Sequence, residues 1–580
     1  MRTKLLLIAS AAVVLALPAI AQQAAPVQPA PAVSPPAATA PAASSAQPTP
    51  SEGGIDETAV EEVSNNTLQP PTPPVEYPRW ARRDFWTVGA LEPADARITG
   101  DAWGAANGIF LTTLMRRMQT PIASRWAHIA LRDALLAKVR APSGVNPVDW
   151  VAERGWLLLR MGEADAARML VAAVDVDRFT PKMTQVAVQS ALANADPPAL
   201  CPLEDGIKKY DPGVTRLVQA ICASLAGEPD QASAMIDQAR RFGRIGGVDL
   251  ALAEKVVGAA GGGRASTIEW DPVDSLTSWR FGLATGTGMV PPDRLISTAS
   301  PQLRAFQARA PLLSPQQRLP SAIVAAGLGV FSSQTMVDLY SAIYDSTDPG
   351  DLPDSDSWQL RQAFVGKDQD TRIAAIRKLL GAGKDSLTKE AERAAVARAA
   401  SLITPDSKLA KDAPELISAM LAGGYDEAAA RWIPAVNSMD NVDSDRCWAM
   451  LALAAPNIAD VGSGRITSFI KRDDSRDHVR SSLLVAALAG LGRISTDTAN
   501  TLNRRYGLGL GHVSSWTKII DAAAERGQGG TVLVLTGTGF QTPRFDRVPA
   551  AHLYHSVSAL RRTGQDFTAR MIAAEALSRT

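Results

Sequence analysis

Apolar positions recur at three- and four-residue intervals along most of the chain after residue 79, which predicts helices almost throughout. The runs that show this best are SRWAHIALRDALLAKVR from residue 124, DWVAERGWLLLRMG from residue 149 and KEAERAAVARAASLI from residue 389. Pro and Gly separate the runs, as is typical of helix ends. The convincing alternation of apolar and polar residues that favours strands is absent from the sequence. The pattern therefore predicts an all-α fold over residues 79–580.

A second regularity is a glycine followed by small or apolar residues at offsets of 5, 9 and 12. We expect the glycine to form a tight turn between two antiparallel helices, because it adopts left-handed backbone conformations without strain. The later positions fall on one face of the second helix, where small side chains allow close packing. The pattern predicts an α-solenoid of helical hairpins. The glycine and first small residue of each copy are Gly162 with Ala167, Gly227 with Ala232, Gly423 with Ala428, and Gly564 with Ala569.

The turn and second helix, seen in GEADAARML, GEPDQASAM and GYDEAAARW, resemble the tetratricopeptide repeat. The resemblance implies a solenoid architecture and a role in binding other proteins. No binding residues carry over, because the first helix of each pair lacks a consistent Trp-Leu-Gly pattern and the spacing between hairpins is irregular. Residues 480–580 are the most regular part. There, Gly492, Gly527 and Gly564 are 35 and 37 residues apart, close to the repeat length of about 34 residues.

The segment GQGGTVLVLTGTGFQ, residues 527–541, allows two interpretations. It falls where the partner helix of SSWTKIIDAAAERG belongs, so we favour a degenerate helix, although β-branched residues and glycines make it a poor helix in isolation. A strand over 531–540 is the alternative. A dinucleotide site would need a third glycine after Gly537 and Gly539, but Thr542 stands there. We therefore expect no nucleotide cofactor.

The N-terminus has the three parts of a secretory signal. Arg2 and Lys4 precede an apolar run from Leu5 to Leu17, and Ala19 and Ala21 form an A-x-A cleavage site. We predict a signal peptide over 1–21 of bacterial type, and hence a periplasmic protein, with secretion beyond the periplasm as the alternative. Residues 22–78 are rich in Ala, Pro, Gln, Ser and Thr and predict a disordered linker. Since no later run reaches the length of a membrane span, we expect no integral membrane segment after signal cleavage.

The charge balance bears on whether the protein binds nucleic acid, and the cysteines bear on whether it contains a disulfide. The chain has 59 basic and 59 acidic residues, so we expect no general affinity for nucleic acid. Cys201 and Cys222 flank a connection that contains Pro and Gly, and in an oxidising compartment they can bond across two packed helices. We predict this disulfide, with two buried thiols as the alternative. Cys447 lies in an apolar run and we expect it to be buried.

Three segments contain residue types that are found in ligand or metal sites, but none of them has the complete pattern of such a site. LLGAGKDS, residues 379–386, lacks the first glycine and the Ser/Thr of a phosphate loop, so it predicts a helix connection. His552 and His555 share a helical face, but no third metal ligand is evident. The acidic run from Asp345 to Asp356 lacks the ligand order of a calcium loop and predicts a solvated loop. We therefore predict no catalytic residue, no metal and no cofactor.

These observations favour a non-enzymatic exported scaffold or adaptor that binds envelope proteins through a helical-repeat surface. The alternative is an envelope protein that binds peptidoglycan or a small ligand. Its architecture would be related to the superhelical part of lytic transglycosylases. Cleavage of glycan needs a positioned acid, and the family carries it in a Glu-Ser motif. After residue 500, Glu525 and Glu575 are followed by Arg and Ala, so this motif is absent.

Overall fold

The structure is a computed structural model that describes residues 78–261, 267–458 and 461–580. The predicted signal peptide over 1–21 and, except for Pro78, the predicted linker over 22–78 lie outside these residues. The described residues belong to two compact units, one spanning 83–580 and the other contributing residues 78–82. The smaller unit contains a 3-10 helix, η1 (Arg79–Ala81).

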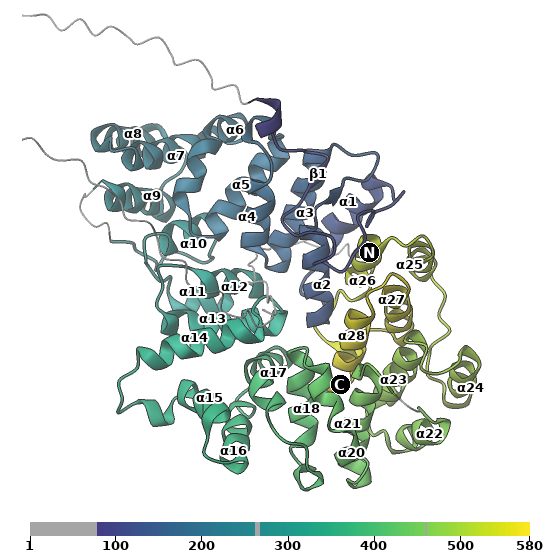
Figure 1. Cartoon of the computed structure of the whole chain (residues 1–580). Helices are drawn as coiled ribbons and strands as arrows, with labels where there is room; N and C mark the ends of the chain where they lie inside the picture. Colours follow the sequence, from purple (N-terminus) through teal and green to yellow (C-terminus); the bar gives the residue numbers. More distant parts are fainter. Residues whose placement is uncertain (1–77, 262–266, 459–460) are drawn as a thin grey trace, which may run out of the picture. The chain divides into compact units, whose positions relative to one another are not determined.

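The larger unit has an all-α helical-repeat fold (Figure 1). Its one described sheet pairs β1 (Thr87–Val88) with β2 (Val139–Arg140) in antiparallel register. The helices up to residue 285 are α1 (Gly108–Arg117), α2 (Arg125–Leu136), α3 (Pro147–Met161), α4 (Ala164–Ala172), η2 (Val176–Arg178), α5 (Pro181–Ala193), η3 (Pro197–Leu203), α6 (Glu204–Tyr210), α7 (Pro212–Leu225), α8 (Pro229–Phe242), α9 (Gly247–Ala260) and α10 (Ser278–Thr285).

The remaining helices continue the array towards the C-terminus. The helices up to residue 436 are α11 (Asp293–Thr298), α12 (Pro301–Arg309), α13 (Pro315–Leu328), α14 (Ser333–Asp345), η4 (Leu352–Asp354), α15 (Asp356–Val365), α16 (Gln369–Leu379), α17 (Ser386–Ser401), η5 (Ser407–Leu409), α18 (Ala413–Ala422), α19 (Asp426–Ala430) and α20 (Ile433–Val436). The last helices are α21 (Asn441–Ala454), α22 (Ser463–Arg472), η6 (Arg476–His478), α23 (Val479–Gly490), α24 (Thr496–Tyr506), α25 (Ser515–Glu525), α26 (Gly529–Gly539), η7 (Phe545–Arg547), α27 (Ala550–Arg562) and α28 (Asp566–Ser578).

Glycine turns join several of the helix pairs. Gly162, Gly227 and Gly564 have φ angles of 111°, 84° and 82° and link α3 to α4, α7 to α8 and α27 to α28. The paired helices contact each other in each case. The small residues five positions after these glycines are Ala167, Ala232 and Ala569, and each is fully buried.

The hairpin of α18 and α19 has its turn one residue later than the sequence analysis placed it. Gly423 ends α18 with a φ of −89°, and Gly424 has the left-handed φ of 81°. The small residue five positions after Gly424 is Ala429, which is fully buried, whereas Ala428 is half-buried. The repeat-packing pair in this hairpin is therefore Gly424 and Ala429, in place of Gly423 and Ala428.

Residues 531–539 belong to the helix α26, which ends before Phe540, and its glycines explain how so poor a helix sequence is accommodated. A Cβ atom on Gly530 would lie 2.9 Å from the ring of Trp103, and one on Gly539 would lie 2.5 Å from the ring of Trp516. The missing side chains let both indole rings approach the α26 backbone. Packing against neighbours thus stabilises a sequence of low helix propensity.

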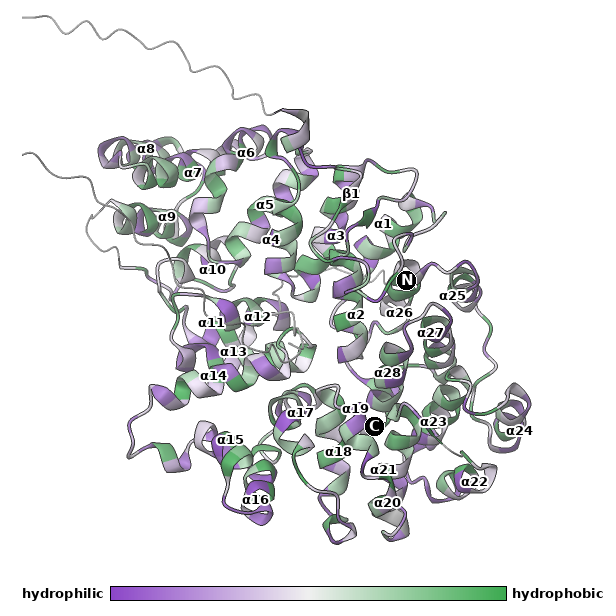
Figure 2. Cartoon of the chain, in the orientation of Figure 1, coloured by the Kyte–Doolittle hydropathy of each residue, from purple (hydrophilic) through white to green (hydrophobic). Residues whose placement is uncertain are grey.

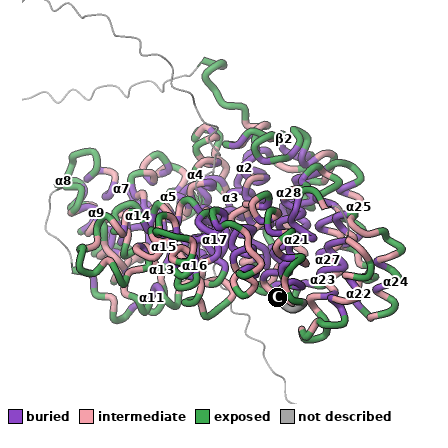
Figure 3. The backbone as a smooth tube through the Cα atoms, turned by 60° about the horizontal axis from the view of Figure 1, so that its bottom comes forward, coloured by how far each residue is buried: buried purple, intermediate pink, exposed green. Residues whose placement is uncertain are grey.

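The core is formed by the apolar faces of amphipathic helices, which Figure 2 shows as hydrophobic and hydrophilic residues interleaved along single helices. One large apolar cluster spans most of the unit, and a smaller one joins α5 to α10. Figure 3 shows α28 and its neighbours α21 and α27 as largely buried, whereas α8 and α24 are largely exposed. Within the described residues, no helix combines the length and apolar character that a membrane crossing requires.

Helices from the two ends of the larger unit pack on each other, with α2 in contact with α26 and α28. Glu575 of α28 accepts hydrogen bonds from Ser124 Oγ at 2.5 Å and from the Arg125 amide at 2.7 Å, at the N-terminus of α2. The Arg125 side chain also donates to the carbonyl oxygens of Ala326, Phe331 and Ala422, at 2.9, 3.0 and 2.6 Å. This junction positions the end of α28 beside the starts of α17 and α18.

Candidate functional site

A charged cleft of about 860 Å³ lies beside this junction. It is bounded by the connection from α16 to α17 and by residues of α17, α18, α21, α22, α23 and the end of α28. Its lining contains eight Lys or Arg and six Asp or Glu side chains, so both signs of charge meet in one cavity. Its volume is within the range of about 300–1,000 Å³ that is usual for ligand sites.

Most of the arginines in the charged cleft are neutralised by carboxylates in its wall. Arg393 contacts Glu415 with N–O distances of 3.0 and 3.2 Å, and Arg446 reaches the same carboxylate at 2.9 Å. Burial alone would raise the pKa of Glu415, but Arg393 and Arg446 outweigh it and lower that pKa. Arg472 forms a bidentate pair with Asp445, at 2.5 and 2.9 Å. These pairs stabilise the wall and leave little net charge on it.

Two further carboxylates in the cleft cap helices. Asp385 accepts from the amides of Leu387 and Thr388 at the start of α17, at 2.9 and 3.0 Å. Asp473 accepts from the amide and the hydroxyl of Ser481 near the start of α23, at 2.8 and 2.6 Å. Since Asp385 occupies the N-terminus of α17, that helix end is not open to a phosphate group. The segment over 379–386 therefore connects α16 to α17 without forming a phosphate loop.

Arg480 pairs with Asp474 at 2.9 Å and Arg579 pairs with Glu575 at 2.7 Å. Four charged side chains of the cleft then remain that neither cap a helix nor form an ion pair among the described residues. Lys384, Lys389 and Lys411 are exposed and form no ion pair with any residue that the structure describes. Glu392 is half-buried, and its Oε2 atom is shielded from water and lacks a hydrogen-bond partner among the described residues. Burial raises the pKa of Glu392 to about 7, although a hydrogen bond from the Gly383 amide opposes this shift.

None of the eight repeat-packing residues from the sequence analysis lines the charged cleft. They lie at four separate hairpins and serve the packing of helices. Glu392 and the three lysines could not be identified from the sequence, because a charged residue in a helical run carries no local sign of a missing ion-pair partner. A lysine in LLGAGKDS was visible, but its position beside α18 and α28 depends on contacts between distant segments.

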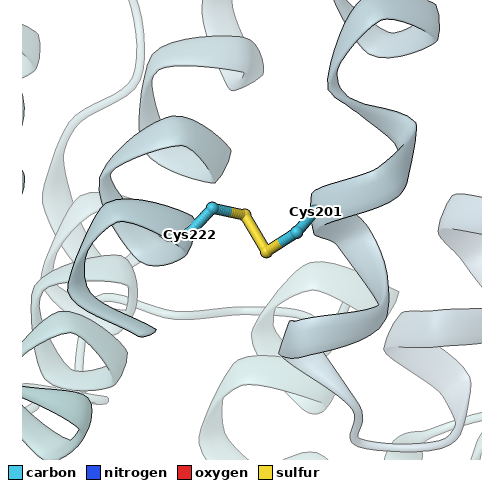
Figure 4. The surroundings of a disulfide bond; sticks show 2 residues. All are labelled: Cys201 and Cys222. Carbon is cyan, nitrogen blue, oxygen red and sulfur yellow. A yellow bond between two sulfur atoms is a disulfide. The ribbon is translucent and has the colours of Figure 1, made fainter. Parts of the chain in front are cut away.

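Cys201 in η3 and Cys222 in α7 are joined by a disulfide, with their Cα atoms 5.6 Å apart (Figure 4). The bond links two segments of the smaller apolar cluster, far along the chain from the residues of the charged cleft. Cys447 is buried in α21. The disulfide is therefore a structural link between η3 and α7.

The two histidines of α27 have different partners. His552 Nδ1 lies 3.1 Å from the Gly539 carbonyl oxygen, and its ring lies 4.3 Å from that of Trp516. His555 Nδ1 lies 2.9 Å from an Asp521 carboxylate oxygen. Across the described residues there is no group of three or more His, Cys, Asp or Glu side chains that could hold a metal ion.

The tryptophans are dispersed among separate contacts. Trp103 packs edge-on against Trp150 with ring centroids 5.0 Å apart, and both rings are buried. Trp126 packs against Phe567 at 5.4 Å. Among the described lining residues of the charged cleft, Phe469 is the one aromatic side chain. The cleft thus offers charges, and not an aromatic platform, to a ligand.

No family model matches this chain, and no curated protein or solved structure matches it either.

Proposed function

We propose that the chain is an exported, non-enzymatic scaffold of the bacterial envelope, built from tetratricopeptide-like hairpins, that binds a partner protein through the charged cleft. The observation that supports this proposal is the cleft itself. Six helices contribute to its lining, it is large enough for a peptide segment, and three of its cations form no ion pair with the residues that the structure describes. Unpaired charges on a protein favour a binding partner of complementary charge. Such complementarity also speeds the association of the two proteins and fixes the register in which they bind.

Site-specific crosslinking in intact cells tests this proposal. A photoreactive amino acid replaces Lys411 at the cleft in one variant and Lys518 on α25 in the other. Both lysines are exposed and form no ion pair with a described residue. We expect an envelope protein to be captured from position 411 and not from position 518. If both positions capture the same proteins, or if position 411 captures peptidoglycan fragments alone, the protein-scaffold function is wrong.

A further inference from the structure

The charged cleft presents its unpaired groups as one anion and three cations, and this arrangement restricts the chemistry of the ligand. Glu392 and Lys389 lie in the first turns of α17 and Lys384 in the connection before it, and Lys411 lies just before α18. A purely acidic segment would satisfy the lysines but would also face the Glu392 carboxylate. A purely basic segment would form an ion pair with Glu392 but would be repelled by the three lysines.

The carboxylate of Glu392 is held in the wall by the backbone of the preceding connection. A Cβ atom on Gly383 would lie 3.0 Å from both of its oxygens, so the glycine backbone lies directly against the carboxylate. Lys389 and Arg393 act on this carboxylate from a distance and lower the pKa of Glu392. Arg393, however, pairs with Glu415, and the exposed Lys389 forms no ion pair with a described residue. A half-buried carboxylate without a direct ion pair is unfavourable, and a cation supplied by a ligand would offset this cost.

We propose that the charged cleft recognises a peptide segment with a basic and an acidic side chain close together, the basic group on Glu392 and the acidic group on Lys384, Lys389 and Lys411. This inference rests on the proposed function and adds the chemistry of the partner segment. A ligand with an acidic group alone leaves Glu392 unpaired, and a ligand with a basic group alone leaves the three lysines unpaired. The cleft therefore selects a ligand that carries both groups. The three lysines steer the acidic group, and Glu392 selects the basic one.

Binding of capped peptide pools to the full chain tests this inference. The flanking positions are randomised, and the central pair is Lys–Glu, Gln–Glu or Lys–Gln. We expect the Lys–Glu pool to bind about tenfold more tightly than either other pool, as one well-placed charge pair can achieve. Glu392→Gln should abolish the preference for Lys–Glu over Gln–Glu, and the triple change of Lys384, Lys389 and Lys411 to Gln should abolish the preference over Lys–Gln.

Matched controls separate this effect from a general loss of charge or of folding. Glu427→Gln and Lys518→Gln remove exposed charges outside the cleft and should leave all preferences unchanged. Glu392→Asp keeps the charge and should retain part of the preference, which a merely misfolded cleft would not. An unchanged preference in Glu392→Gln, or equal binding of the three pools to the parent chain, overturns the inference. If position 411 still captures a partner in cells, the scaffold function survives that result.

Discussion

At the scale of the residue, Glu392 should make the stability of the chain depend on pH in a defined direction. Burial and the nearby Asp356 raise its pKa from 4.5 to about 7, against the Gly383 amide, Lys389 and Arg393. The folded state therefore retains a proton that the unfolded state releases, so stability falls as the pH rises from about 4.5 to about 7. Tyr340 on α14 also faces this group, but it stays protonated in this range because burial raises its pKa.

Glu392→Gln removes this dependence. We expect the variant to match the parent near pH 4 and to be more stable at pH 8, by no more than about 1 kcal/mol because solvent screens a half-buried carboxylate. Urea denaturation across this pH range measures the difference, with the exposed Glu427→Gln as the control. A difference that is constant with pH, or that grows towards low pH, contradicts the raised pKa.

The environment of Glu392 could not be predicted from the sequence. In KEAERAAVARAASLI, Glu390 and Glu392 are equivalent by pattern. In the structure Glu390 is buried and lies 3.5 Å from Arg393, whereas the Oε2 atom of Glu392 has no described partner. Glu390 pairs with Arg393 in the same helix, whereas Glu392 lies against Gly383 of the preceding connection. Helical periodicity identifies α17 but not which of its carboxylates is left for a ligand.

At the scale of the element, the helical periodicity and the glycine turns predicted the all-α fold, but a glycine doublet left the register of one hairpin ambiguous. Either Gly423 or Gly424 can form a turn in the sequence, and the left-handed φ of 81° belongs to Gly424. Ala429→Leu should therefore overpack the hairpin and destabilise the chain by about 1–3 kcal/mol. Ala428→Leu, at a half-buried position, should cost clearly less. A larger loss for Ala428→Leu than for Ala429→Leu would support the register that the sequence suggested, and equal losses would contradict Ala429 as the packing residue.

The disulfide gives a second element-scale prediction. It closes a loop with a sequence separation of 21 residues between η3 and α7, and a loop of this size restricts the unfolded chain by about 3 kcal/mol. Cys201→Ser with Cys222→Ser should therefore loosen α7, α8 and α9, which share the smaller apolar cluster. Hydrogen exchange should speed up in these helices and not in α27 or α28. Uniform loss of protection along the chain would show that the smaller cluster does not unfold separately.

At the scale of the whole molecule, the contact between α2 and α28 distinguishes this chain from an open repeat array, in which each repeat contacts its neighbours alone. The two helices are more than 400 residues apart in sequence, so no local pattern could predict their contact. Glu575 is one of the two glutamates after residue 500, and it lacks the following serine of the Glu-Ser motif. It is buried at the junction, where Arg579 contacts its carboxylate at 2.7 Å.

Removal of the Glu575 carboxylate should destabilise both α2 and α28. Glu575→Ala leaves the buried Arg579 without its counter-ion and the Ser124 hydroxyl without its acceptor, so we expect a loss of about 3–5 kcal/mol. Glu525→Ala breaks an exposed 3.6 Å pair with Arg562 and should cost less than about 1 kcal/mol. Urea denaturation gives the two losses, and hydrogen exchange shows whether α2 and α28 open in the same variant. If Glu575→Ala frees α28 while α2 keeps its protection, the two ends are stabilised independently. The buried carboxylate would then cap one helix without joining the two.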